Sequence, residues 1–356
     1  MNPDFQKLTI CLDMAGCPNR CRHCWVGHAP NAQLIAEDLR FVATAFRPFT
    51  DKLEVASWYR EPDYPDNYRE LWQLENELSD HRTVPHWELC SFWRAVCDEA
   101  YVPWLAALGV KACQLTLFGG REKTDYYTGR KGAYDEILKT IELLLANGIA
   151  PRIQTFLLND NADDLQSVAA LIEQMLLEQR CAAIGTPFTA FVHQGSCDGA
   201  NAERNSLYDL RPTSEDIAKI PPLLVDYSLK HFGKESILEI FGQTERELFT
   251  ELSRDASTKS SVSDSPIFYV DSRFNVYPNF SEPSPHWCLG NVKTDGAEKV
   301  MRNYLENCPA AAQTRLTIPI GEMVSKCGSP DSLRLFDKSD YEAYILSKYL
   351  ESEAAK

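Results

Sequence analysis

The chain has 356 residues, 44% hydrophobic and 11% aromatic, so it holds enough apolar side chains for a substantial folded core. Its formal charge is −15, which argues against a nucleic-acid partner because phosphate binding depends on clustered lysine and arginine. No apolar segment reaches the length of a membrane span, and residues 1–14 lack the apolar core of a secretion signal. We therefore expect a cytoplasmic protein with no membrane partner.

The first two-thirds of the chain alternate between predicted strands and helices. The predicted strands are Lys7–Asp13, Lys52–Ser57, Trp87–Trp93, Lys111–Phe118, Pro151–Leu158 and Thr186–His193. The predicted helices are Asn31–Phe46, Tyr68–Leu78, Glu99–Leu108, Ala133–Ala146 and Leu165–Gln179. Strand–helix steps with short connections imply parallel strands joined by right-handed crossovers. The predicted fold class is therefore α/β, a partial (β/α)6 TIM-like barrel with a small α+β C-terminal cap. An open doubly wound sheet is the alternative, because periodicity does not separate the two.

After about residue 195 the alternation stops. Residues 214–249 have helical spacing with an interruption at Pro221-Pro222, and residues 253–266 form a polar, serine-rich linker. A β-hairpin is predicted over residues 267–280, and a C-terminal helix from Ser339. We therefore divide the chain into a core domain (1–200), a helical connector with linker (201–262) and a C-terminal segment (263–356).

Three cysteines with C-x3-C-x2-C spacing, Cys17, Cys21 and Cys24, follow the first predicted strand directly. Three thiolates can hold a cubane iron–sulfur cluster and leave one iron open to another ligand, whereas four would close it. Zinc is the alternative, with His23 or His28 as fourth ligand, although the sequence has no second cysteine or histidine pair at the usual spacing. A disulfide is disfavoured, because most of the twelve cysteines sit singly in apolar segments, as in a reducing compartment.

This spacing, followed by an aromatic residue at the end of the first strand of a βα repeat, resembles the radical S-adenosyl-L-methionine (SAM) superfamily. The resemblance implies an oxygen-sensitive, metal-binding site in which Cys17, Cys21 and Cys24 hold a [4Fe-4S] cluster and Trp25 lies beside the adenine of SAM. In that family the cluster reductively cleaves SAM to a 5′-deoxyadenosyl radical, which abstracts hydrogen from the substrate. It also implies a reductant such as flavodoxin or ferredoxin.

The family carries a Gly-Gly-Glu-Pro run at the end of its second strand, where it holds the methionyl amine of SAM. Glu61 and Pro62 match the last two positions of that run. Tyr59 and Arg60 replace the two glycines, and their bulky side chains are candidates to project toward the substrate.

The fourth predicted strand and its helix resemble the peptide- and sulfatase-modifying branch of the family. The resemblance implies that Thr116 and Arg130 contact the cofactor. Gln154 on the fifth predicted strand is a further candidate for binding the ribose or the substrate, with hydrogen bonding inside the barrel as the alternative.

Residues 268–307 resemble the auxiliary-cluster segment of that branch, called SPASM or Twitch. Asn279 stands at the position of its first cysteine, and Cys288 before Leu-Gly-Asn remains, while Cys308 and Cys327 are isolated. We predict a SPASM-like fold that caps the barrel without a second cluster. The alternative is a cluster on Cys288, Cys308, Cys327 and a further cysteine, Cys197.

The leading hypothesis is a radical SAM enzyme that acts on a small molecule or natural-product intermediate. Sixteen residues precede Cys17, too few for a fused leader-peptide domain, so a radical SAM maturase of a short ribosomal peptide comes second. An iron–sulfur electron-transfer or zinc-binding protein without turnover is the alternative of another class. The sequence leaves the catalytic residues and the reaction outcome open.

Overall fold

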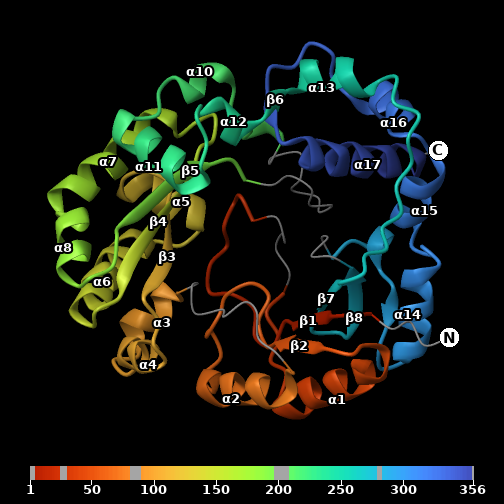
Figure 1. Cartoon of the computed structure of the whole chain (residues 1–356), viewed down its shortest axis with the longest axis horizontal. Helices are drawn as coiled ribbons and strands as arrows, with labels where there is room; N and C mark the ends of the chain where they lie inside the picture. The colour runs from red at the N-terminus through yellow and green to blue at the C-terminus, as the bar shows by residue number, and fades with distance from the viewer. Residues whose placement is uncertain (1–4, 25–29, 81–89, 196–207, 279–282, 355–356) are drawn as a thin grey trace.

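The structure, a computed structural model, describes residues 5–24, 30–80, 90–195, 208–278 and 283–354. In Figure 1 the elements follow a ring, with strands β3, β4 and β5 on one side and the C-terminal helices closing the other. Both chain ends lie on the same side of this ring.

The first sheet has five strands in the order β2–β1–β7–β8–β9. Strand β1 (Leu8–Leu12) lies parallel to β2 (Leu53–Ala56) and to β7 (Ile267–Val270). Strands β8 (Asn275–Pro278) and β9 (Gly290–Asn291) continue the sheet in antiparallel pairs. Because β1 is central and covered on both faces, it reads as a nearly continuous apolar run.

Three helices cover this sheet and share one buried apolar cluster with it. They are α1 (Ala36–Phe46), α2 (Tyr68–Leu78) and α14 (Ala297–Leu305). The cluster joins side chains that are far apart in the sequence, for example Ile10 of β1 and Val300 of α14. The C-terminal segment is therefore part of the same core as the first strand.

The second sheet has three parallel strands in the order β3–β4–β5: β3 (Ala112–Leu117), β4 (Ala150–Phe156) and β5 (Thr189–His193). The helices around it are α3 (Phe92–Cys97), α4 (Tyr101–Ala107), α5 (Arg121–Thr128), α6 (Ala133–Ala146), α7 (Leu165–Gln174), α8 (Leu177–Ala183) and α11 (Pro222–Phe232). Apolar residues at helical spacing on α6, such as Ile137, Ile141 and Leu144, are fully buried against the sheet.

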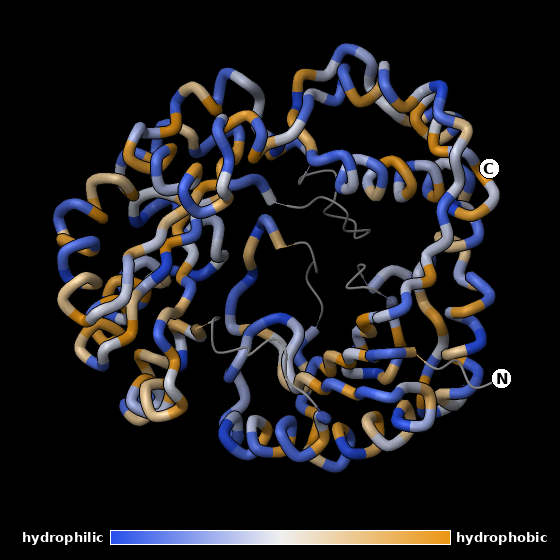
Figure 2. Tube along the Cα trace, in the orientation of Figure 1, coloured by the Kyte–Doolittle hydropathy of each residue, from blue (hydrophilic) through white to orange (hydrophobic). Residues whose placement is uncertain are grey.

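The remaining elements belong mainly to the connector and the C-terminal helical layer. They are α10 (Ser214–Ile217), α12 (Leu238–Phe241), β6 (Gln243–Thr244), α13 (Glu245–Leu252), α15 (Ala310–Thr317), α16 (Ile320–Cys327), β10 (Leu335–Phe336), α17 (Lys338–Ala354) and the short 3-10 turns η1 (Arg47–Phe49), η3 (Ala162–Asp164) and η4 (Pro285–Trp287). Figure 2 shows polar and apolar residues alternating along the helices, as amphipathic helices with one buried face require.

The predicted α/β partial barrel is confirmed as a fold class; in the described residues its main strands form a mixed five-stranded sheet and a parallel three-stranded sheet rather than one closed barrel. The hairpin and the C-terminal helix also form as predicted, as β7–β8 and α17. The segment predicted as helical, 214–249, has the expected break at Pro221-Pro222, where α11 begins, and two further breaks where Gly233 and Gly242 follow α11 and α12. The domain boundaries at 200 and 262 stay a prediction.

The predicted third strand, Trp87–Trp93, is wrong over its described part. Residues 81–89 lie outside the described residues, and α3 begins at Phe92. The Ser91 hydroxyl accepts a hydrogen bond from the Arg94 amide (3.3 Å) and so caps this helix. The aromatic residues suggested a strand, but this N-cap starts a helix among them.

Candidate active site

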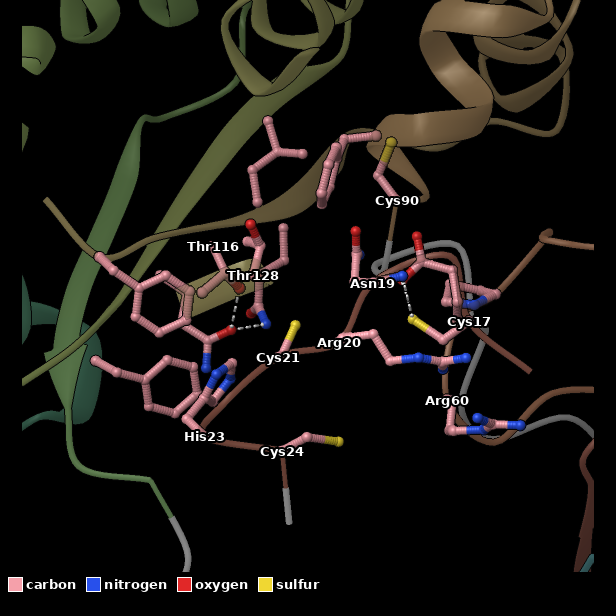
Figure 3. A pocket seen from close by; sticks show the side chains of 18 of the residues that line it. Cys17, Asn19, Arg20, Cys21, His23, Cys24, Arg60, Cys90, Thr116 and Thr128 are labelled. Carbon is pink, nitrogen blue, oxygen red and sulfur yellow. Dashed lines mark hydrogen bonds between the residues drawn. The ribbon is translucent and has the colours of Figure 1, made fainter. Parts of the chain in front are cut away.

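A cavity of about 330 Å³ lies where the loop after β1, the segment after β2 and strands β3 and β4 meet (Figure 3). Functional groups gather at the carboxyl ends of parallel strands in barrel folds. Its walls combine cysteines, acids, amides and aromatic rings. The residues used below are Cys17, Asn19, Cys21, His23, Cys24, Tyr59, Arg60, Glu61, Gln114, Thr116, Phe118, Gln154 and Phe156.

All three cysteines of the predicted triad, Cys17, Cys21 and Cys24, line this cavity. Two anchors hold their loop. Asn31 clasps the backbone of Cys17, accepting from its amide (3.1 Å) and donating to its carbonyl (2.8 Å). On the other side, the Arg20 amide donates to the carbonyl of Thr128 (2.9 Å) at the end of α5. The loop is therefore positioned from both sides of the cavity.

The cysteine thiols do not converge on one point. The described residues contain no group of three or more His, Cys, Asp or Glu side chains arranged around a single metal ion.

Burial raises the pKa of both Cys17 and Cys21 above that of a free thiol, and the nearby Glu61 carboxylate raises it further. Against this, the Asn19 amide donates to the sulfur of Cys17 (3.4 Å) and favours its thiolate. Metal ligation requires the thiolate form, so iron binding at this site must displace protons.

Arg60, a sequence-based candidate to project toward the substrate, lines the cavity but is held by other side chains. Its guanidinium pairs with Asp13 (2.8 Å), and the two side chains are 5% and 4% exposed. It also donates to the side-chain oxygen of Asn31 (3.0 Å), the residue that clasps Cys17. Tyr59 stacks on Tyr269 of β7 at 3.6 Å between ring centroids. The two bulky residues thus link the cysteine loop to the first sheet.

Glu61 presents an acceptor to the cavity. One carboxylate oxygen, Oε2, lies 3.9 Å from the sulfur of Cys17. The other, Oε1, is buried and has no hydrogen-bond partner in the described part of the chain. Burial raises the pKa of Glu61 to about 7, and the nearby hydroxyl of Ser91 partly offsets this rise. A buried acceptor without a donor is unfavourable unless a ligand supplies one.

The strands of the second sheet contribute a fixed polar network. The Gln154 carbonyl oxygen accepts from the side chains of Gln114 (2.5 Å) and Thr116 (3.2 Å). Its amide nitrogen lies 2.6 Å from Nε2 of His193, and burial lowers the pKa of His193 to about 4. Because the amide nitrogen can only donate, a neutral His193 must accept at Nε2. The two hydrogen bonds that the Gln154 carbonyl oxygen accepts then fix the orientation of its amide group. The second N–H of this amide takes no part in the network.

His23 is a site residue that sequence reasoning considered only as a zinc ligand. Its ring lies 4.6 Å from that of Phe118 and 4.4 Å from that of Phe156. Burial lowers its pKa to about 3, and its Nδ1 has no partner among the described residues. Because His23 lies between Cys21 and Cys24 in the sequence, its place in the cavity could have been predicted from the cysteine motif.

Of the predicted cofactor contacts, Arg130 does not line the cavity, and Trp25 is a residue that the structure does not describe. Arg130 forms a two-pronged ion pair with Glu136 (2.7 and 2.6 Å) and donates to the side chain of Asn19 (2.9 Å). It therefore supports the cysteine loop from behind and is not among the lining residues. Trp25 lies outside the described residues.

The remaining C-terminal cysteines sit in different surroundings. Cys288 packs beside the tyrosines of β7 and β8, Cys327 packs against the C-terminal helical cluster, and Cys308 is exposed. Asn279 and Cys197 lie outside the described residues. Within the described ranges these thiols do not form a group of three.

Comparisons with known proteins agree with this arrangement. Residues 12–172 match the family model described as the Radical SAM superfamily. A search of curated proteins gives no match. Native anSMEcpe with bound AdoMet shares 12% identity and a TM-score of 0.51, with 98% of each chain covered. Native anSMEcpe with bound AdoMet and Kp18Cys peptide shares 13% identity and a TM-score of 0.51, over 98% of this chain and 100% of that chain.

Streptococcus suis SuiB bound to precursor peptide SuiA shares 12% identity, over 77% of this chain and 59% of that chain, with a TM-score of 0.43. At such identities the likeness to anSMEcpe shows a common fold. None of the helices in the described ranges is long and apolar enough to cross a membrane.

Proposed function

We propose that this chain is a radical SAM enzyme, with its radical SAM domain over residues 12–172, that holds a [4Fe-4S] cluster on Cys17, Cys21 and Cys24. The enzyme abstracts hydrogen from a small-molecule or natural-product substrate. The observation that carries the site assignment is the meeting of all three thiols in one cavity with the carboxylate oxygen of Glu61 that has no described partner.

The residues present fit both groups. Three thiols leave one iron of the cubane open. The buried Oε1 of Glu61, which has no described partner, suits the ammonium group of SAM, because that group supplies the missing donor. Thr116 and the amide of Gln154 provide hydrogen-bonding groups farther along the cavity. When bound, the cluster supplies the electron that reductively cleaves SAM and generates the radical for hydrogen abstraction.

The chain's own residues bind and orient SAM, and they exclude water from the site. Glu61 binds the positive end of SAM, and Gln154 offers an N–H whose direction His193 sets. The rings of His23, Phe118 and Phe156 form an apolar wall. A reactive radical needs a dry surrounding, which such a wall provides. Trp25 stays a candidate beside the adenine, and Arg130 acts by holding Asn19 rather than by touching the cofactor.

A short peptide is the second candidate substrate. Its support is the fold shared with anSMEcpe in complex with AdoMet and a Kp18Cys peptide, which matches 98% of this chain with a TM-score of 0.51. We further propose one cluster only, a reductant such as flavodoxin or ferredoxin, and a cytoplasmic location without nucleic-acid or membrane partners. These proposals rest on the sequence.

Anaerobic reconstitution with iron and sulfide, followed by dithionite and SAM, tests the proposed function. We expect 5′-deoxyadenosine and methionine in equal amounts. A C17A/C21A/C24A variant should bind no cluster and form neither product. A reconstituted protein that holds iron but leaves SAM intact would instead support an electron-transfer role.

Deuterated candidate substrates test the substrate class. Hydrogen abstraction should transfer deuterium into 5′-deoxyadenosine from a true substrate. Transfer from peptides alone would favour the maturase over the small-molecule enzyme.

A further inference from the structure

A second cavity, of about 220 Å³, lies in the C-terminal part of the chain and shares no lining residue with the first. Its walls come from the linker, the 3-10 turn η4, the junction of α15 and α16, and the first half of α17. The lining residues are Ser257, Thr258, Lys259, Trp287, Arg315, Ile318, Ile320, Met323, Ser339, Glu342, Ala343 and Leu346.

The linker forms a defined wall of this second cavity. The Lys259 amide donates to the carbonyl of Arg315 (3.0 Å), and the Ile320 amide donates to the carbonyl of Ser257 (3.1 Å). The side chain of Lys259 also pairs with Glu342 of α17 (2.5 Å). A segment that reads as loose linker in the sequence is therefore fixed to three helices, so the cavity is formed before any ligand binds.

The second cavity combines an apolar floor with one unbalanced charge. Ile320, Met323 and Leu346 are 7%, 2% and 4% exposed and pack in the C-terminal helical core. Glu342 is neutralised by Lys259, whereas the side chain of Arg315 makes no hydrogen bond or ion pair with any described residue. In a chain of net charge −15, this site thus offers a guanidinium that no described carboxylate neutralises, beside apolar surface. Arginine pairs well with a carboxylate in such a setting.

Trp287 connects this cavity to the cysteine loop. It packs against the C-terminal helical cluster and also against the cluster of Tyr59, Tyr269 and Tyr277, against which Cys24 packs as well. A ligand in the second cavity would therefore contact a ring that also packs against the tyrosine cluster beside Cys24.

We propose that the second cavity binds a small carboxylic acid, with an apolar side chain against Ile320, Met323 and Leu346 and a carboxylate that pairs with Arg315. This site is separate from the cavity that holds the cysteine loop, so the proposal does not depend on the proposed function.

Ligand-observed NMR on the reconstituted full chain tests the proposal with two matched probes, N-acetyl-L-leucine and its primary amide. The wild-type chain should bind the acid about tenfold more tightly than the amide, which corresponds to about 1.4 kcal/mol, because only the acid forms a charge-assisted hydrogen bond with Arg315. The Arg315→Gln variant should lose this preference and bind both probes alike. This cycle isolates the contact between carboxylate and guanidinium.

Two further variants locate the binding. Ala343→Trp fills the cavity and should abolish binding of both probes; Ala343→Leu serves the same purpose if the larger residue disturbs folding. Arg302→Gln, on the exposed face of α14, is the control and should keep the wild-type preference. Equal binding of acid and amide to the wild type, or a preference that survives Arg315→Gln or both Ala343 changes, overturns the proposal. SAM cleavage by the wild type is scored separately, so failure there counts against the proposed function alone.

Discussion

At the scale of single residues, the acceptor of Glu61 determines what the cavity can hold. Its Oε1 is buried without a described partner, so a bound ammonium is worth more there than at a solvated carboxylate. We expect Glu61→Gln to weaken SAM binding about tenfold or more, since a neutral amide loses the charge-assisted bond. Equilibrium dialysis with labelled SAM measures this. Glu122→Gln, at an exposed position on α5, is the control and should bind SAM like the wild type.

His193 makes stability depend on pH. Its pKa is about 4 in the folded chain and about 6.5 when unfolded, so the unfolded chain binds more protons between these values. The contribution of His193 to the free energy of unfolding should therefore be constant above pH 6.5 and fall as the pH drops toward 4, by about 2 kcal/mol at pH 5. Urea unfolding at pH 7 and pH 5 measures the loss. His193→Gln should reduce it, and an unchanged slope would contradict the assignment.

At the scale of elements, the end of α5 is fitted to the cysteine loop. Gly129 has φ 64° after the last turn of α5, and a Cβ there would overlap the carbonyl of Arg20. Gly233 has φ 63° after α11, with nothing within 4 Å of a Cβ. Gly233→Ala should thus cost only the left-handed backbone strain, about 1 kcal/mol.

Gly129→Ala should cost more than this and should also lower the iron bound per chain, because the loop must move. Thermal unfolding and iron analysis of both variants make the comparison. Equal losses of stability with full iron binding in both would show that the contact with Arg20 is unimportant.

At the scale of the whole molecule, the C-terminal segment completes the first sheet. Strand β7 pairs with β1 in parallel, and Phe268, Val270 and Val300 share a buried cluster with Ile10 and Leu12. A chain ending at residue 262 should therefore lack a cooperative unfolding transition, since β1 would lose a neighbour and half its cover. Circular dichroism during heating tests this.

A chain ending at residue 337 is the matched control for this truncation. It removes α17 but keeps β7, β8 and β9, and it should still bind iron. A sharp transition in the shorter chain would mean that residues 1–262 fold independently, as the predicted domain boundary implies.

Local patterns were enough to predict much of this protein. Helices α2 and α6 lie where apolar spacing predicted them, and the β7–β8 hairpin where alternation and turn residues did. The cysteine spacing, the aromatic residue after it and the strand before it together resembled the radical SAM superfamily. These features depend on residues close in sequence, whose periodicity and spacing are visible directly. The third predicted strand failed because a single N-cap outweighed its aromatic composition.

Long-range contacts decided the rest. Arg60 pairs with Asp13, and Arg130 pairs with Glu136. His193 forms a hydrogen bond with Gln154. In each case the fold brings the two side chains together. The pairing of β7 with β1 and the walls of the second cavity likewise join segments far apart in the chain. Residue types and spacing thus specify the chemistry of the cysteine loop, whereas which polar groups are left for ligands depends on burial and pairing in three dimensions.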